Sequence, residues 1–222
     1  MLRALAELLF PARCVGCQRS GSVLCARCRR DLKYLDGVCH RCALPRRGWS
    51  GGCRGCARLS AALRSLHAVC AYEGAARSAV HALKYRGGRL LAESMGELMR
   101  DALRQRPVMA ELVVPVPMSS RRRKERGYNH SLLLALQVAP CVGGVVAEVL
   151  ERQHRQTQRG LSAAARASNI VGTVRARQQL NGERVLVIDD VATTGATLSV
   201  CADALIGAGA GTVTALVFAR DL

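Results

Sequence analysis

Hydrophobic and polar positions follow different patterns on the two sides of residue 60. Residues 1–60 show little helical or strand periodicity beyond the first turns, whereas the rest of the chain has apolar runs and apolar residues at three- and four-residue spacing. Apolar runs are typical of buried strands, and the wider spacing is typical of helices. We therefore expect strands at 66–72, 111–116, 145–150, 184–189 and 212–218, and helices at 75–85, 89–104, 129–138 and 196–207.

The expected strands and helices alternate along residues 61–222. This order is typical of βαβ crossovers, which build a mostly parallel sheet flanked by helices. Residues 1–60 contain prolines and a glycine-rich run and predict a separate small module. We therefore divide the chain into a module at 1–60 and an α/β domain at 61–222. The polar, Arg- and Gln-rich segment 151–166 is too long for a tight connector and predicts a mobile loop.

The apolar opening segment, residues 1–10, is short and contains Glu7. It runs into Pro11 and a cysteine pair instead of a small-residue cleavage site, so we interpret it as an amphipathic helix and not as a signal peptide. No stretch approaches the roughly 18–20 apolar residues that a membrane-spanning helix needs. These features predict a cytoplasmic protein with no membrane span.

Cysteines are the main anomaly of the composition. Eight of the 11 lie in C-x-x-C pairs with the spacings C-x2-C-x7-C-x2-C and C-x2-C-x10-C-x2-C: Cys14, Cys17, Cys25 and Cys28, then Cys39, Cys42, Cys53 and Cys56. Without an export signal, such pairs favour metal over disulfides, and four thiolates suit a closed structural zinc site. We expect two zinc ions held by sequential pairs, with interleaved pairs as the alternative.

The other cysteines and one histidine have simpler interpretations. His40 could replace a cysteine ligand, although a solvated side chain is the preferred interpretation. Cys70, Cys141 and Cys201 stand in apolar surroundings and are expected to be small core residues.

The net charge narrows the possible partners. The chain has 33 Lys and Arg against 16 Asp and Glu, a formal charge of +17. Such a protein attracts polyanions, which leaves nucleic acid, phosphorylated metabolites and anionic membranes as candidates, with a solvated arginine-rich surface as the simpler alternative. One Trp, four Tyr and two Phe leave little capacity for base stacking, so nucleic-acid binding would be largely electrostatic.

The segment VLVIDDVATTGATL, residues 185–198, carries the clearest chemistry. A buried strand ends in Asp189 and Asp190, and small and hydroxyl residues then lead into a helix. Ligands bind at the carboxyl ends of parallel strands, and a helix N-terminus favours a phosphate. Adjacent carboxylates suit a diol or a magnesium ion, although two acids can also simply precede a helix.

This segment resembles the motif of type I phosphoribosyltransferases that binds phosphoribosyl pyrophosphate (PRPP). The resemblance implies that Asp189 and Asp190 hold the ribose hydroxyls and that the 5-phosphate is held by Thr193, Thr194, Gly195, Ala196 and Thr197. The segment VVPVPMSSRRRKERGYNHS, residues 113–131, resembles the pyrophosphate loop of that fold, with Ser119, Ser120 and Arg126 as donors. A solvated basic loop is the alternative.

The order of all these motifs closely resembles the ComF family of competence-associated, phosphoribosyltransferase-like proteins. It runs through paired cysteines, LKYRGG, VPVP, RGYNHS, RQTQRGLSAAARASN and the PRPP motif, and covers nearly the entire chain. One departure is His130, where glutamine is expected. The resemblance places Lys84 near the pyrophosphate and assigns four residues to a flexible loop over PRPP: Arg155, Thr157, Gln158 and Arg166. For each of these, an exposed residue without a ligand is the alternative.

The resemblance implies a protein that binds PRPP and magnesium, acts in DNA uptake and natural transformation, and binds single-stranded DNA. The resemblance also implies a competence helicase or another DNA-uptake protein as partner. Any helicase must be another chain, because this chain lacks a G-x4-G-K-[ST] loop. The alternative is an active phosphoribosyltransferase in nucleotide or related metabolism without nucleic-acid binding. A third interpretation makes the zinc module a protein-docking element. The sequence does not name an acceptor substrate.

Overall fold

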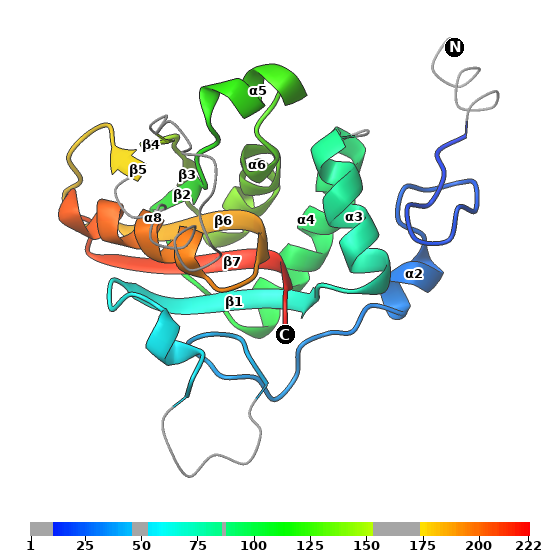
Figure 1. Cartoon of the computed structure of the whole chain (residues 1–222), viewed down its shortest axis with the longest axis horizontal. Helices are drawn as coiled ribbons and strands as arrows, with labels where there is room; N and C mark the ends of the chain where they lie inside the picture. Colours follow the sequence, from blue (N-terminus) through cyan, green and yellow to red (C-terminus); the bar gives the residue numbers. More distant parts are fainter. Residues whose placement is uncertain (1–10, 46–52, 86–87, 153–173) are drawn as a thin grey trace, which may run out of the picture.

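The computed structural model describes residues 11–45, 53–85, 88–152 and 174–222. A parallel sheet of order β1-β7-β6-β2-β3 forms its centre (Figure 1). Its strands are β1 (Leu63–Ala71), β2 (Leu112–Pro115), β3 (Val145–Val146), β6 (Arg184–Ala192) and β7 (Thr212–Arg220). A separate antiparallel pair consists of β4 (Leu150–Arg152) and β5 (Val174–Ala176). The expected parallel α/β sheet flanked by helices is confirmed.

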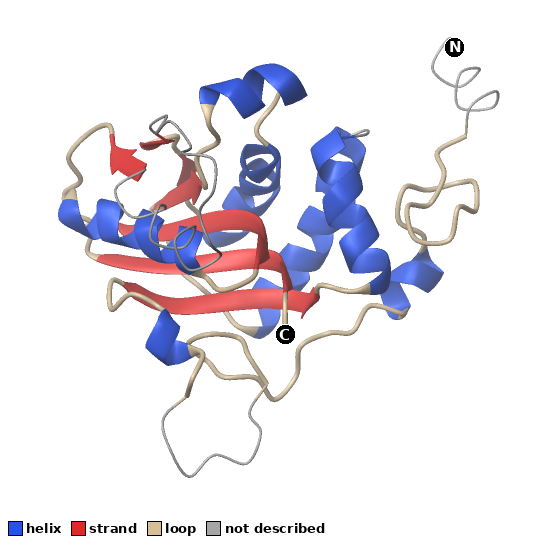
Figure 2. Cartoon of the chain, in the orientation of Figure 1, coloured by secondary structure: helices blue, strands red, loops and turns tan. Residues whose placement is uncertain are grey.

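Helices cover both faces of the sheet (Figure 2). One face is covered by α3 (Gly74–Tyr85), α4 (Gly88–Gln105) and α6 (His130–Val142), and the other by α8 (Ala196–Gly207). The alternation of side chains along β6 explains this arrangement, because successive residues of a strand point to opposite faces. Leu186 and Ile188 pack with the first group of helices, whereas Val185 and Val187 pack with α8.

The two cysteine-containing segments lie on opposite faces of this sheet. The first, residues 11–32, contains α2 (Ala26–Arg30) and places Leu24 and Leu32 in the core formed by α3 and α4. The second, residues 38–59, ends in the short 3-10 helix η1 (Cys56–Arg58) and places Val38 and Leu59 in the core shared with α8. In Figure 1 the first segment lies beside α3 and the second lies beyond β1. Each segment therefore packs into a different hydrophobic core of the α/β fold.

Three expectations about local structure are wrong. The expected strand at 145–150 is two short strands, β3 and β4, which pair with different neighbours in different sheets. The basic segment expected to be a loop contains the helix α5 (Ser120–Arg126), which begins at the N-cap Ser119 and ends at Gly127 in the left-handed conformation. Cys141 is exposed, unlike the buried Cys70 and Cys201.

Two further expectations fall on residues that are not described. These are the amphipathic helix at 1–10 and most of the loop at 151–166, of which only the first two residues are described, within β4. Within the described part of the chain, no helix is long and apolar enough to cross a membrane.

Candidate functional site

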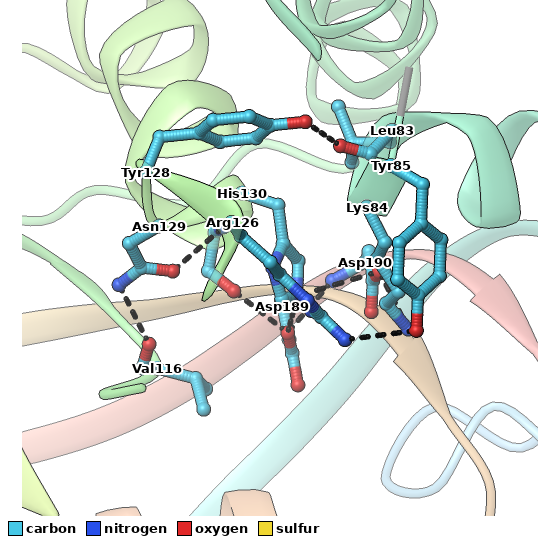
Figure 3. Close-up of polar contacts among 11 residues, drawn as sticks. Leu83, Lys84, Tyr85, Val116, Arg126, Tyr128, Asn129, His130, Asp189 and Asp190 are labelled. Atoms are coloured by element: carbon cyan, nitrogen blue, oxygen red, sulfur yellow. Dashed lines mark hydrogen bonds and ion pairs between the residues drawn. The ribbon is translucent and has the colours of Figure 1, made fainter. Parts of the chain in front are cut away.

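Two adjacent carboxylates lie near the carboxyl end of β6, beside the end of β2. Asp190 is buried, and its Oδ2 lies 2.9 Å from the Nζ of Lys84 and 3.4 Å from the Nε2 of His130 (Figure 3). Lys84 comes from α3 and His130 from α6, so two helices meet the strand at this point. The sequence predicted Lys84 near the pyrophosphate, whereas in the structure its ammonium group pairs directly with Asp190.

Asp189 has different surroundings from its neighbour. Its Oδ1 accepts hydrogen bonds from Ser131 Oγ at 2.8 Å and from the backbone N–H of Asp190 at 2.9 Å. Burial, and then repulsion by the Asp190 carboxylate, raise the pKa of Asp189 to about 7 despite these hydrogen bonds. The folded protein therefore favours the protonated form of this carboxyl group more than the unfolded chain does.

His130 is neutral at pH 7. Burial lowers the pKa of its imidazole to about 4, and the cations Lys84 and Arg126 act in the same direction, while Asp190 opposes them. Its Nδ1 lies 3.5 Å from Nη1 of Arg126, which can only donate, so Nδ1 is the acceptor. The proton then sits on Nε2 and faces the carboxylates.

The start of α6 is fixed to the end of β2 by the side chain of Asn129. Its Oδ1 accepts from the backbone N–H of Ser131 at 3.1 Å and caps the helix, while its Nδ2 donates to the carbonyl oxygen of Val116 at 3.1 Å. This buried amide sets the positions of His130 and Ser131 relative to the carboxylates.

The turn between α5 and α6 is tied to the end of α3. The Arg126 guanidinium lies 5.0 Å from the centre of the Tyr85 ring and donates to its hydroxyl at 3.4 Å. Tyr128 donates from its hydroxyl to the carbonyl oxygen of Leu83 at 2.6 Å (Figure 3). Arg126, which the sequence predicted as an anion donor, is thus held over the site by an aromatic ring.

The chain turns from β6 into α8 through the predicted phosphate segment. Gly195 is the N-cap of α8 and has a φ of 84°, a conformation that favours glycine. The N–H of Ala196 donates to Thr194 Oγ1 at 3.2 Å, while Thr193 and Thr194 are exposed. The first turn of α8 therefore starts beside the carboxylates, and apart from the N–H of Ala196 its first backbone N–H groups have no acceptor within the helix and can bind an anion.

A cavity of about 180 Å³ lies between the two carboxylates, the start of α6 and the first turn of α8. Six of the predicted residues line it: Lys84, Ser119, Arg126, Asp189, Asp190 and Thr197. Ser120 lines a neighbouring cavity instead, and residues 193–196 lie outside the lining. The predicted loop residues Arg155, Thr157, Gln158 and Arg166 lie outside the described residues.

Sequence analysis gave no role to several residues of this cavity. Asn129 and Ser131 stood inside the quoted RGYNHS motif, so the motif itself was the available signal. Arg122 and Arg152 also line the cavity and increase its positive charge.

The eight paired cysteines form two clusters in the expected sequential order. Within each cluster the four sulfur atoms lie within 4.8 Å of one another. Distances between Sγ atoms are 3.6 Å for Cys17 and Cys25 and 3.4 Å for Cys42 and Cys53. A tetrahedral zinc ion with Zn–S bonds of about 2.3 Å places sulfurs roughly 3.8 Å apart, so both clusters fit zinc. The interleaved pairing is wrong, and His40 is exposed and outside both clusters.

Without a bound metal ion the thiols of each cluster differ in acidity. Burial opposes ionisation of Cys14 and Cys39, but backbone N–H groups lower the pKa of each thiol to about 6. Burial and the neighbouring thiols raise the pKa of Cys28 to about 12 and that of Cys42 to about 11. A bound divalent cation would offset the repulsion between the thiolates and would lower the pKa of the thiols that are protonated without it.

Two family models match the chain. The double zinc ribbon domain matches residues 5–59, and the phosphoribosyl transferase domain matches residues 129–222.

Among curated proteins, DNA utilization protein YhgH of Salmonella typhimurium is 29% identical over 90% of this chain and 91% of that protein. Competence protein F of Haemophilus influenzae is 27% identical over 84% of this chain and 80% of that protein. The chain is a homologue of these proteins.

A third curated protein extends the similarity. Competence protein ComFC of Bacillus subtilis is 27% identical over 89% of this chain and 84% of that protein. The resemblance to the ComF family is therefore confirmed, as is the combination of a zinc-ribbon segment with a phosphoribosyltransferase-like fold. Among solved structures, the allosteric regulatory enzyme of purine biosynthesis is similar to 62% of this chain and 30% of its own, with a TM-score of 0.42 and 21% identity.

Proposed function

We propose that this protein binds PRPP together with Mg²⁺ and acts in DNA uptake and utilization, where it also binds single-stranded DNA. One observation carries the PRPP assignment: adjacent carboxylates near the end of β6 are followed by a short turn that leads into the N-terminus of α8. In this arrangement Asp189 and Asp190 accept hydrogen bonds from the ribose hydroxyls, and residues 193–197 hold the 5-phosphate.

Several cationic and polar groups are arranged to receive the pyrophosphate. Ser119 and Arg126 line the same cavity as the carboxylates, and Lys84 adds a further cation to it. Mg²⁺ prefers carboxylate and phosphate oxygens and keeps several waters, so the Asp189–Asp190 pair and the pyrophosphate would share it. Bound Mg²⁺ would neutralise charge on the pyrophosphate. Ser120 and the four residues of the predicted loop over PRPP, named above, complete the proposed site.

Zinc is proposed to be structural at both cysteine clusters. Each cluster has four sulfur ligands, which leaves no coordination position for a substrate. Two zinc ions per chain would fold segments that are too small to build cores of their own.

The role in DNA uptake rests on the homologues, which carry the names competence protein and DNA utilization protein. The charge of +17 supports direct contact with single-stranded DNA. A helicase or another protein of DNA uptake is the proposed partner.

Calorimetry with PRPP and Mg²⁺ tests the assignment. Changing Asp189→Ala together with Asp190→Ala removes both acceptors for the ribose hydroxyls, and we expect affinity to fall at least tenfold, or about 1.4 kcal/mol. Asp101→Asn on the exposed surface of α4 serves as the control and should bind as the parent does. Equal affinity of the double variant and the parent would refute the proposed site.

Transferase activity is the second candidate, favoured by the phosphoribosyl transferase domain match at 129–222. The protein would be incubated with PRPP, Mg²⁺ and a panel of bases and amines while pyrophosphate release is measured. Release that requires one acceptor would establish an enzyme. PRPP binding without release for any acceptor would support a PRPP-binding protein.

A further inference from the structure

The buried side chain of Arg220 joins the second cysteine segment to the phosphate turn. Arg220 is the last residue of β7 and is 1% exposed. Its Nε donates to the carbonyl oxygen of Cys42 at 3.2 Å, and its Nη1 donates to the carbonyl oxygens of Ala192, at 2.9 Å, and of Thr193. Cys42 is a member of the second cluster, so one guanidinium bonds the proposed zinc site and the phosphate turn at once.

These contacts orient the backbone of the turn. A peptide group is planar and trans, so its N–H points away from its C=O. The Ala192 carbonyl oxygen also accepts from the backbone N–H of Asp221 at 2.9 Å, so Arg220 matters most at the Thr193 carbonyl. By holding that carbonyl group, Arg220 directs the N–H of Thr194 to the opposite side. A buried guanidinium without acceptors is costly, which favours this one arrangement of the backbone.

The residues that follow the second cluster contact the phosphate turn and α8. Leu59 is buried against Gly195, where any Cβ would clash with its Cδ2. The N–H of Ser60 donates to Ser199 Oγ at 3.1 Å, and the Ser60 hydroxyl bonds Asp203. Together these contacts attach the first two turns of α8 to the end of the second cysteine segment.

The first cysteine segment is attached elsewhere. Its Arg29 pairs through Nη1 with Glu97 Oε2 at 2.6 Å on α4, and its Gly16 packs against Ala75 near the start of α3. Arg29 therefore anchors the first segment to α4, whereas Arg220 bonds the second segment and the phosphate turn. Arg29 therefore serves as the comparison residue on the first segment, although it is partly exposed and Arg220 is buried.

We propose that Arg220 is a positioning residue for phosphate binding, and that zinc at the second cluster, but not the first, holds the turn 193–197 in its anion-binding form. The inference rests on the proposed function, because it concerns how the 5-phosphate is bound. Zinc fixes Cys42, Cys42 orients Arg220, and Arg220 orients the turn. Zinc loss at the second cluster would thereby weaken phosphate binding although no zinc ligand touches the phosphate.

Two measurements on the full chain test this inference. Calorimetry gives the affinities for ribose 5-phosphate and, separately, for magnesium pyrophosphate, and hydrogen exchange gives the protection of the amides at 193–199. We expect Arg220→Met and Cys53→Ser to weaken ribose 5-phosphate binding at least tenfold and to speed amide exchange. Magnesium pyrophosphate affinity should change less than twofold, which a general loss of structure would not allow. Arg220→Lys should recover part of the affinity, and Arg29→Met should match the parent.

Several results would overturn the inference. One is parental affinity and exchange in Arg220→Met, and another is equal damage by Arg29→Met. If Arg220→Met loses affinity for ribose 5-phosphate and for magnesium pyrophosphate alike, Arg220 has a general structural role and does not position the turn. If Cys53→Ser does not fold, Arg220→Met and Leu59→Ala test whether the second segment positions the turn. Leu59→Ala removes the contact with Gly195 and should also weaken ribose 5-phosphate binding. If the parent does not bind ribose 5-phosphate, the proposed function fails, while hydrogen exchange still shows whether Arg220 orders the turn.

Discussion

Asp189 is a carboxyl group whose protonated form is favoured by the folded protein. Burial and the Asp190 carboxylate raise its pKa to about 7, from an ordinary value near 3.8. The folded protein therefore binds a proton that the unfolded chain releases between about pH 4 and 7. By linkage, this group makes the free energy of unfolding fall as pH rises through that range, by at most about 1.4 kcal/mol per pH unit.

The first prediction is that Asp189→Asn flattens this pH dependence in the absence of PRPP and Mg²⁺. His130 acts in the opposite direction below pH 6.5, because its folded pKa of about 4 makes the unfolded state bind the extra proton. Denaturant unfolding should be compared between the variant and the parent from pH 6.5 to 8, because His130 is present in both proteins and its contribution cancels in the difference between them. The variant should be more stable than the parent at pH 8. An unchanged slope, with Asp101→Asn as the control, would show that Asp189 is already ionised.

At the level of elements, the two cysteine segments are similar in chemistry and different in attachment. The first packs with α3 and α4, and the second with α8 and the phosphate turn. We predict two zinc ions per chain by elemental analysis of freshly purified protein, and one in Cys25→Ser. The sheet should stay folded in that variant, because its strands pair without the first segment. Fewer than one zinc ion in the parent would contradict the assignment.

The elements that sequence analysis predicted well have strong apolar patterns. The run before Asp189 predicted β6, and the spacing of apolar residues predicted α3, α4, α6 and α8 within a few residues. The helix α5 was missed because it has no buried residues and so has no apolar periodicity. Its signals were the capping residue Ser119 and the terminal Gly127. The segment 145–150 was misread because pairing with distant strands, which the local pattern does not specify, divides it between two sheets.

The candidate site was predictable where one segment carries its chemistry. Asp189 and Asp190 follow a buried strand directly, so the sequence alone placed them at the edge of a parallel sheet. The contacts of Ser131 and Arg220 were not predictable, because they depend on how α6 and the second cysteine segment pack against β6 and β7. Arg220 near the end of the chain gives no local sign of a buried role.

At the level of the whole molecule, the excess of positive charge is the main support for DNA binding. The helix α5 presents Arg122 and Arg123 at the surface beside the cavity, and Arg123 also pairs with Glu148 at 3.2 Å. When binding is governed by counterion release, the logarithm of the affinity falls linearly with the logarithm of the salt concentration. The slope is about −0.7 for each phosphate neutralised on a single strand.

We predict that changing Arg122→Ala and Arg123→Ala reduces this salt slope by about 1.4, the sum expected for two phosphate contacts. The change Arg104→Ala with Arg106→Ala removes the same charge around the C-terminal end of α4 and should have a smaller effect. Fluorescence anisotropy of a labelled single-stranded oligonucleotide at several salt concentrations gives both slopes. Because Arg122 also lines the cavity, saturating PRPP should weaken DNA binding. Absence of binding even at low salt would remove the nucleic-acid proposal.

A crystal structure of the protein with PRPP and Mg²⁺ would show directly whether PRPP binds in this cavity. We expect the ribose hydroxyls on Asp189 and Asp190, and the 5-phosphate within hydrogen-bonding distance of the backbone N–H groups of residues 194–197. The pyrophosphate should face Ser119, Arg126 and Lys84. PRPP bound outside the cavity, or a 5-phosphate that does not contact the start of α8, would contradict the proposed site.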